Sequence, residues 1–325
     1  MDWKGEFVEL LFPLESTKMR MDDAYHLKYQ HLPVSLYKYR DVNEHSKQNL
    51  LEGTVWLADP ETLNDPYECA HLIDVNSLSQ HCFKNPSKGL IQRIPDEQKA
   101  TGIIEALKSS DNPMETILDS MLESKPIEQR TQYRTAFMSA ISELHDDVAR
   151  AFVARMKRAF KLCSFSERND STLMWAHYAN YHKGFCIEYN VRNLPPTDFV
   201  AKFMYPVIYS NELIDLSCHV KCDPEHKEFN NLYPNRIGLR KAVDWSYEKE
   251  WRLLFANGII DKPQAYKMPT PTAVYLGSHI KQADQKEIID ICDRIKVPVK
   301  KMQHSLKEYK MQAIPVEEAD RKRFW

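Results

Sequence analysis

The chain has 325 residues, 43% of them hydrophobic, and its 44 Lys and Arg residues nearly balance its 46 Asp and Glu residues, giving a net charge of −2. This length and composition allow a sizeable buried core in one large domain or two ordinary ones. The near-neutral charge excludes a broad electrostatic attraction for nucleic acid and leaves only a local basic patch open.

The eight glycines are widely spaced, at positions 5, 53, 89, 102, 184, 238, 258 and 277. Dinucleotide and phosphate loops need two or three closely spaced glycines, because the backbone must approach the phosphate without a Cβ in the way. The sequence therefore contains neither a G-x-G-x-x-G pattern nor a Walker A loop, and it also lacks the G-x-S-x-G nucleophile elbow.

Cysteine spacing and the lack of long apolar runs indicate the compartment. The seven cysteines are odd in number and scattered, and no two form a C-x-x-C pair. The first residues show no signal-peptide pattern, and no apolar run reaches the ~20 residues that span a bilayer. We therefore expect a reduced, cytoplasmic protein without a membrane span.

The tightest cluster of histidine and cysteine is the pattern Cys218-His219-x-x-Cys222-x-x-x-His226. This spacing matches no standard zinc site, and the segment is polar. A plain loop is the preferred interpretation, so no metal is predicted.

The first predicted elements alternate between strand and helix. The aromatic, alternating segment Leu36–Arg40 predicts a strand, and 44–51 predicts a short helix with Gly53 as its C-cap. A second strand is predicted over Thr54–Leu57, followed by the turn Asn64-Asp65-Pro66. Because a proline keeps the preceding residue out of the helical region, we expect an extended loop to display the carboxylate at position 65.

Residues 96–160 carry a helical pattern. Two shorter helices, 96–109 and 113–123, precede a long helix that begins near Pro126. Apolar residues recur every three or four positions along the long helix, and charged residues fill its opposite side. The apolar stripe consists of Tyr133, Phe137, Ile141, Leu144, Val148, Phe152, Met156 and Phe160. We expect this stripe to face the core, and a partner-binding helix is the alternative.

The rest of the chain is rich in short strands. They are expected at 161–165, 184–189, 206–209, 251–255, 273–276, 297–301 and 310–316, with a helical turn at 173–178 and a helix at 282–295. Strands, an inserted helical block and further strands with short links favour an α+β fold with a mixed sheet. We therefore predict a single domain over residues 1–325 with a helical insertion at 96–160.

The segment Trp245–Phe255 brings two acids and an arginine together. Side chains alternate along a strand, so we expect Glu248, Glu250 and Arg252 to share one face of the strand that this segment forms. Buried acids cost free energy unless they are paired, so either Arg252 satisfies both carboxylates or the face opens into a cleft. An ion-paired strand face and a functional site account for the pattern about equally well.

Two further groups of residues are candidates for ligand binding. The helical turn offers Trp175, His177 and Tyr178, close to the strand that carries Ser164, although Trp and Tyr at such positions are more often core residues. On the first strand Lys38 and Arg40 share a face. Either an exposed strand or a cleft that grips phosphate explains this pair of cations.

Five ordered blocks stand out: Leu36–Arg40, Asn64–Tyr67, Cys163–Glu167, Met174–Ala179 with His182–Gly184, and Tyr247–Arg252. They resemble the signature blocks of a bacterial family known as domain of unknown function 2971, whose members often occur near anti-phage genes. The resemblance covers roughly residues 36–280. Leu63 and Tyr67 stand where the family usually has Phe, a change that touches packing more than chemistry. The family name supplies no activity.

The order of Tyr37 to Arg40, Asn49 to Gly53 and Glu248-Lys249-Glu250 also resembles ADP-ribosyltransferase folds, more remotely. This resemblance implies a mostly antiparallel split sheet and NAD as the substrate, without a metal. It implies that Glu250 stabilises an oxocarbenium-like cation and that Glu248 orients the acceptor. The NAD-binding candidates are Tyr37, Lys38, Arg40, Ser164, Trp175, His177 and Tyr178, and the further candidates are Asn64, Asp65 and Arg252.

Three functions compete. The leading hypothesis is an NAD-consuming or ADP-ribosylating effector in anti-phage defence, with an unknown protein or nucleic-acid acceptor and a partner protein of the defence system. The second is a metal-dependent nuclease that uses Asp65 and a Glu-x-Lys pattern at Glu225–Lys227 or Glu308–Lys310. The third is a non-catalytic sensor or binding module in which the two acids and Arg252 form an internal ion-pair network.

Overall fold

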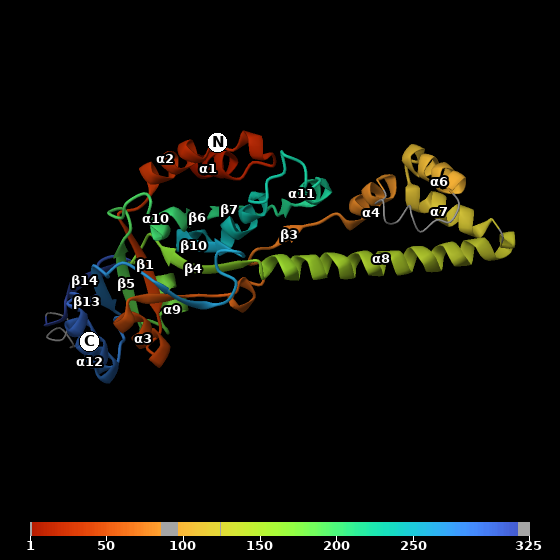
Figure 1. Cartoon of the computed structure of the whole chain (residues 1–325). Coiled ribbons are helices and arrows are strands. Elements are labelled where there is room, and N and C mark those ends of the chain that lie inside the picture. Colours follow the sequence, from red (N-terminus) through yellow and green to blue (C-terminus); the bar gives the residue numbers. More distant parts are fainter. Residues whose placement is uncertain (1, 86–96, 124, 318–325) are drawn as a thin grey trace. The chain divides into compact units, whose positions relative to one another are not determined.

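The structure, a computed structural model, describes residues 2–85, 97–123 and 125–317 (Figure 1). The chain forms two compact units, each discontinuous in sequence. Unit 1 comprises residues 1–69, 157–212 and 232–325, and unit 2 comprises 70–156 and 213–231. The predicted insertion at 96–160 falls largely in unit 2, which begins earlier and includes a second segment. The prediction of a single domain over 1–325 stays a prediction.

Unit 1 is built on one eight-stranded sheet with the order β14–β13–β12–β5–β1–β4–β10–β6. Neighbouring strands are antiparallel except β12 and β13, which are parallel. This arrangement confirms the predicted α+β class with a mostly antiparallel sheet. The strands are β1 (Ser35–Arg40), β4 (Phe160–Ser166), β5 (Phe185–Asn190), β6 (Met204–Pro206), β10 (Glu250–Ala256), β12 (Ala273–Leu276), β13 (Val299–His304) and β14 (Met311–Pro315).

The sheet is nearly interrupted between β1 and β4. These strands share one register pair, Tyr37 with Ser166, whereas β1 and β5 pair along the whole of β1. Farther along β4, the partner of Leu162 is Ala58, which belongs to a different segment. The two central strands therefore spread apart beyond this pair, although both belong to the same eight-stranded sheet. The split sheet of an ADP-ribosyltransferase fold stays a prediction.

Local signals explain the elements that follow β1. Helix α3 (Glu44–Glu52) begins with a capping box between Asn43 and Ser46, and it ends at Gly53, whose φ of 62° is left-handed. Strand β2 (Thr54–Leu57) then pairs with β11 (Gln264–Lys267). Val55 and Leu57 of β2 are buried, which leaves Trp56 between them pointing outward and 47% exposed.

The remaining elements of unit 1 surround the sheet. In Figure 1, helices α1 (Trp3–Leu11) and α2 (Met21–His31) lie together near β6 and β10. A large apolar core includes Leu36 of β1, Phe165 of β4 and Trp251 of β10. The other elements are α9 (Thr172–Tyr178), α10 (Phe199–Phe203), α12 (Gln282–Ile295), the parallel pair β7 (Ile208–Tyr209) and β9 (Arg240–Lys241), and the 3-10 turns η1 (Ser16–Lys18), η2 (Pro60–Thr62), η3 (Tyr233–Leu239) and η4 (Val243–Glu248).

The chain enters β10 from a 3-10 turn, so the expectation that the segment Trp245–Phe255 alternates as one strand is wrong before Glu250. Glu248 is the last residue of η4, and Lys249 is left-handed with a φ of 45° before β10 begins at Glu250. A left-handed residue breaks the alternation of a strand. Glu248 and Glu250 therefore do not share a strand face.

Unit 2 consists mainly of helices. They are α4 (Val75–Lys84), α6 (Glu97–Ser109), α7 (Pro113–Leu122), α8 (Ile127–Lys157) and α11 (Ser217–Lys221), accompanied by the parallel pair β3 (His71–Leu72) and β8 (Ile214–Asp215). The three helices predicted between 96 and 160 are confirmed. Among the helices of the described part of the chain, none combines the length and apolar character needed to cross a membrane.

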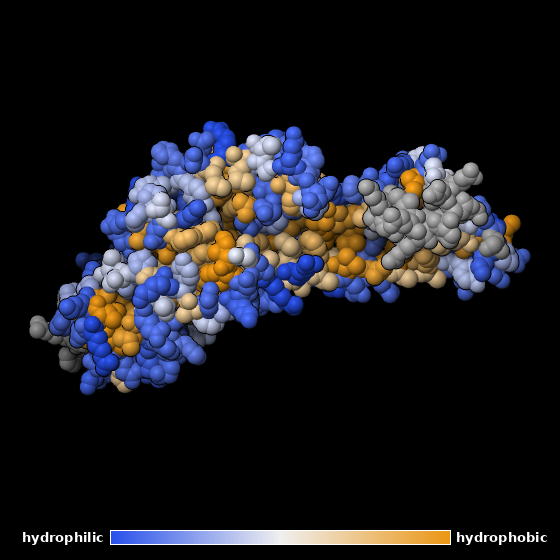
Figure 2. Space-filling view, viewed as in Figure 1, coloured by the Kyte–Doolittle hydropathy of each residue, from blue (hydrophilic) through white to orange (hydrophobic). Residues whose placement is uncertain are grey.

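The expectation that the α8 stripe faces a core is wrong. No described residue of α8 is fully buried, and Tyr133, Leu144 and Val148 are 47%, 54% and 45% exposed. Figure 2 shows orange apolar side chains among blue ones along α8. The other stripe residues of α8, Phe137, Ile141, Phe152 and Met156, are half-buried, so the described residues cover the stripe only in part.

Candidate functional site

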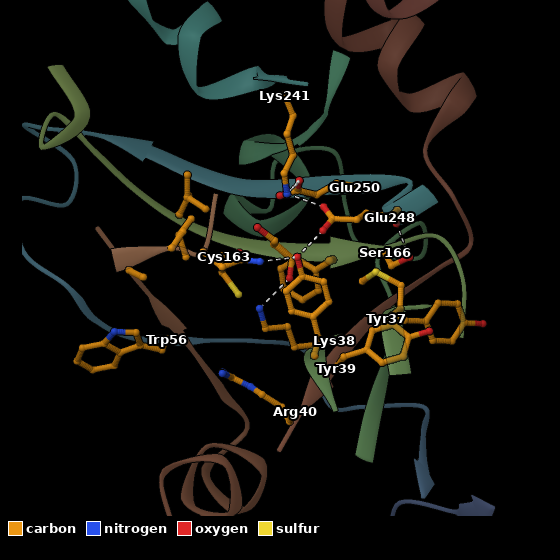
Figure 3. Close-up of a pocket in the computed structure, with 18 of the residues that line it drawn as sticks. Tyr37, Lys38, Tyr39, Arg40, Trp56, Cys163, Ser166, Lys241, Glu248 and Glu250 are labelled. Atoms are coloured by element: carbon orange, nitrogen blue, oxygen red, sulfur yellow. Dashed lines mark hydrogen bonds and ion pairs between the residues drawn. The ribbon is translucent and has the colours of Figure 1, made fainter. Parts of the chain in front are cut away.

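A pocket lies where β1 and β4 spread apart (Figure 3). Its volume is about 200 Å³. Sites that enclose a whole small molecule usually have about 300–1,000 Å³, so this one suits part of a larger ligand. The pocket is lined by Tyr37, Lys38, Tyr39, Arg40, Trp56, Ala58, Leu63, Asn64, Glu68, Leu162, Cys163, Ser164, Phe165, Ser166, Met174, Tyr178, Lys241, Glu248 and Glu250.

One wall of the pocket carries two carboxylates joined by a lysine. The Lys241 Nζ donates to Glu248 Oε2 at 2.5 Å and to Glu250 Oε2 at 3.1 Å. Arg252 does not line the pocket but holds Glu250 in place. Its Nε donates to Glu250 Oε1 at 2.7 Å, and its two terminal nitrogens donate to Glu68 at 2.5 and 3.0 Å. Both acids of the Glu-x-Glu pattern thus reach one lysine, although they come from different backbone segments.

The two carboxylates have pKa values that move in opposite directions. Burial would raise the pKa of Glu250, but the charges of Arg252 and Lys241 outweigh it and lower this pKa to about 2. Burial, followed by the charge of Glu250, raises the pKa of Glu248, and Lys241 opposes this rise. Two acids whose pKa values are pushed apart can divide the roles of fixed anion and proton carrier.

The opposite wall is cationic. Lys38 Nζ donates to the Ser164 carbonyl oxygen at 2.8 Å, and burial lowers the pKa of Lys38. The Arg40 Nη2 is buried and has no hydrogen-bond partner among the described residues, and Figure 3 draws the Arg40 side chain apart from every dashed line. A buried guanidinium nitrogen without an acceptor is costly unless a ligand supplies one.

Aromatic and amide side chains complete the pocket. The Tyr178 hydroxyl donates to Glu248 Oε1 at 2.5 Å and accepts from Asn64 Nδ2 at 3.2 Å. Burial and then the charge of Glu248 raise the pKa of Tyr178, so its hydroxyl keeps its proton. Trp56 lines the pocket from β2 while remaining half exposed, and the Tyr37 hydroxyl donates to Glu188 at 3.3 Å.

Most of the predicted site residues meet in this pocket. Those that line it are Tyr37, Lys38, Arg40, Asn64, Ser164, Tyr178, Glu248 and Glu250. The alternation of β1 and the Glu-x-Glu pattern were the useful signals, because they identified the two charged walls.

Four predicted residues do not line the pocket. Trp175 is 0% exposed, stacks edge-on with Tyr39 and donates its Nε1 to the Asn169 carbonyl, so it is a core residue. His177 is exposed and lies against a tyrosine, with ring centroids 6.1 Å apart. Arg252 is 0% exposed and acts through Glu250.

Asp65, the fourth, corrects the expectation of a displayed carboxylate. It is buried, and its Oδ1 accepts from the Tyr67 amide at 2.8 Å. An Asp side chain that bonds the backbone two residues ahead forms an Asx turn, which draws the carboxylate inward.

Sequence reasoning missed Lys241, Glu68 and Trp56. Lys241 lies in the two-residue strand β9, which carries no pattern of its own, and Glu68 follows the Asn-Asp-Pro turn. Trp56 gave a usable signal, because a large aromatic at the outward position of a strand is unusual unless something covers it.

The residues proposed for a nuclease are dispersed. Asp65 belongs to unit 1 and Glu225 to unit 2, while Glu308 lies between β13 and β14. Within residues 2–85, 97–123 and 125–317, no three His, Cys, Asp or Glu side chains stand as a ready arrangement for a metal ion.

Comparison with known proteins gives one match. Residues 174–253 fit the model of a family described as "Protein of unknown function (DUF2971)". Searches of curated proteins and of solved structures gave no match. The matched segment contains Tyr178, Lys241, Glu248 and Glu250 of the pocket. This match agrees with the resemblance carried by two of the five sequence blocks, Met174–Ala179 with His182–Gly184 and Tyr247–Arg252.

Proposed function

We propose that the chain consumes NAD or transfers ADP-ribose from it, and that the pocket between β1 and β4 holds the scissile part of the substrate. The observation that carries this proposal is the pairing of charges across one cavity: the carboxylates of Glu248 and Glu250 on one wall, and Lys38 with the unpartnered Arg40 Nη2 on the other. A phosphorylated sugar needs both kinds of group, a cation for its phosphate and an anion near its ring.

The chemistry follows from the charges. The bond between the ribose C1′ and the nicotinamide nitrogen breaks, the bonding electrons stay with nicotinamide, and the ribose becomes an oxocarbenium-like cation. Glu250, ionised because its pKa is about 2, stabilises that cation. Water or an acceptor nucleophile then attacks C1′ and loses a proton, for which Glu248 is the acceptor, since its raised pKa makes it the stronger base of the two.

The pocket size sets the position of the rest of the substrate. With about 200 Å³, the cavity accepts the nicotinamide riboside end, so the adenosine end must extend past the mouth. Trp56 offers an exposed aromatic face there. The proposed cellular setting, a cytoplasmic effector of anti-phage defence with a partner protein, rests on the family resemblance.

Release of nicotinamide tests the proposal. The purified full chain is incubated with NAD, with and without cell lysate as a source of acceptors, and nicotinamide is measured by chromatography. Glu250→Gln should reduce the rate by about 10²–10³-fold, as expected when one electrostatic stabiliser of the transition state is lost. Glu167→Gln is the matched control, because Glu167 is a hydrogen-bonded acid outside the pocket that accepts from Trp251. Absence of nicotinamide release by the wild type, or full activity of Glu250→Gln, contradicts the proposal.

A non-catalytic nucleotide sensor is the second candidate, and the burial of Glu250 favours it. Glu250 is 1% exposed and already paired with Arg252 and Lys241, as in an internal ion-pair network. A sensor would bind NAD or ADP-ribose through Arg40 without releasing nicotinamide. Calorimetric binding that is lost in Arg40→Gln, combined with no turnover, would select the sensor over the enzyme.

A further inference from the structure

Three histidines of unit 1 form a cluster outside the pocket. The ring centroids of His182 and His304 are 5.2 Å apart, those of His182 and His279 are 5.7 Å apart, and those of His279 and His304 are 5.7 Å apart. None of the three lines the pocket between β1 and β4. The cluster therefore has no part in the proposed function and is a separate feature.

The sheet topology brings these residues together. His182 precedes β5, His279 follows β12, and His304 ends β13. In the sheet Leu276 pairs with Phe185 of β5 and with Lys301 of β13. The start of β5 and the ends of β12 and β13 consequently meet at one edge of the sheet, and each contributes one imidazole.

The backbone beneath the cluster is constrained. His182 is left-handed with a φ of 66°, as are the two residues before it, a conformation that is unfavourable for residues other than glycine. The His279 amide donates to the His182 carbonyl oxygen at 2.9 Å. A Cβ at Gly277 would lie 2.1 Å from the same oxygen, so glycine there permits the close approach. Two segments are thus held together at the point where the histidines meet.

The spacing of the rings matches a metal-binding triad. A triangle with sides of 5.2, 5.7 and 5.7 Å has a centre about 3.2 Å from each corner. A zinc ion also lies about 3.2 Å from the centre of an imidazole that binds it, because the Zn–N bond is about 2.0–2.1 Å and the nitrogen is about 1.1 Å from the ring centre. An ion at the centre would therefore lie at coordination distance from each ring whose nitrogen points toward it.

The nitrogen atoms are not yet in a ligand arrangement, since no described group of three such residues is ready to hold a metal. A half-turn of an imidazole about its Cβ–Cγ bond exchanges nitrogen and carbon positions and leaves the ring centre nearly in place. His279 and His304 are exposed and have room to turn, and the buried Nδ1 of His182 has no hydrogen-bond partner among the described residues.

We propose that His182, His279 and His304 bind one divalent transition-metal ion, with zinc as the preferred ion and at least one coordination position left to water. Three imidazoles with an open position suit zinc, and cobalt, nickel and copper bind similar nitrogen sets. The ion would fasten the His182 loop to the ends of β12 and β13.

Zinc titration tests the site directly. The full chain is stripped with a chelator, dialysed and titrated with Zn²⁺ in a calorimeter, and one ion per chain is expected. The double variant His279→Ala/His304→Ala should bind at least about 100-fold more weakly, because loss of an outer-shell partner alone already costs about 10–100-fold. Both side chains are exposed, so the variant should fold, and circular dichroism checks that it does.

The control removes the competing cysteines. Cys218 and Cys222, which are exposed, are replaced together by Ser, and zinc binding should be unchanged. Cobalt bound to the wild type should show no thiolate-to-metal charge-transfer band. The proposal is overturned if the wild type binds no zinc, if the histidine double variant binds as tightly as the wild type, or if the cysteine variant loses the site.

Discussion

Replacing Arg252 with Met tests the buried wall of the pocket. The guanidinium is 0% exposed and donates five hydrogen bonds, two to Glu250, two to Glu68 and one to the Gly238 carbonyl. Met fills part of the space and supplies none of these donors. Glu250 keeps Lys241 as a partner, whereas Glu68 loses both of its charge-assisted bonds.

The expected loss of stability is large. Removing one member of a buried ion pair costs about 3–5 kcal/mol, because the remaining charge stays buried without a counterion. This corresponds to a folded-to-unfolded ratio that falls by two to nearly four orders of magnitude, at about 1.4 kcal/mol for each factor of ten. With an m-value of about 1–3 kcal/mol per molar urea, the unfolding midpoint should fall by at least about 1 M.

Tryptophan fluorescence is a suitable probe, because all six tryptophans lie in the segments of unit 1. The control is Arg158→Met, which removes an exposed pair with Glu61 in the same unit and should cost no more than about 1 kcal/mol. Arg252→Lys keeps the charge but loses the planar fork, and should fall between the two. Equal midpoints for Arg252→Met and Arg158→Met would refute the reasoning that the network supports the fold.

Three further predictions concern acid stability, backbone packing and ligand binding. Because the pKa of Glu250 falls from 4.5 to about 2 on folding, its stabilising effect is present above pH 4.5 and lost as the pH falls toward 2. In Glu250→Gln, the free energy of unfolding should therefore depend less on pH between 4.5 and 2 than it does in the wild type. An equal pH dependence in the two proteins would disprove the lowered pKa of Glu250. Gly277→Ala should lower the free energy of unfolding in urea by at least about 2 kcal/mol, because the new Cβ meets a backbone oxygen. The control is Gly102→Ala, in a helix with open space around the residue, which should lose no stability. Trp56→Ala should weaken NAD binding in calorimetry by about 5- to 150-fold, which is the range for base stacking on an aromatic ring. The midpoint of urea unfolding should stay unchanged. An unaltered affinity would show that Trp56 does not contact NAD.

The elements of the fold that depend on neighbours in sequence could be predicted. The alternation of Leu36–Arg40, the cap at Gly53 and the start of α7 after Asn112 all follow from signals within a few residues. Eight of the predicted site residues line one pocket for the same reason, because each charged wall is encoded in a short segment.

The predictions that were wrong or missing concern residues whose positions depend on contacts with distant parts of the chain. The identity of Lys249 gives no sign of a left-handed conformation, so the sequence pattern predicts a strand before β10 where the structure has a 3-10 turn. Lys241 contacts Glu248 and Glu250 because the turn η4 reverses the chain between them. Trp175 and Tyr178 lie on one helical turn, yet one is sealed in the core and the other reaches the pocket, a distinction made by the rotation of α9 against β1.

Because Lys249 is left-handed, Glu248 and Glu250 are held in place by different kinds of contact. The amide of Glu250 donates to the Tyr209 hydroxyl, and its strand pairs on both sides with β4 and β6, so this carboxylate is anchored as firmly as the sheet. Glu248 precedes Lys249, at the end of η4 and outside the ladder, and its carboxylate is held by the side chains of Tyr178 and Lys241. One charge of the pair is therefore positioned by the backbone of the sheet, and the other by two side chains that a substitution can remove.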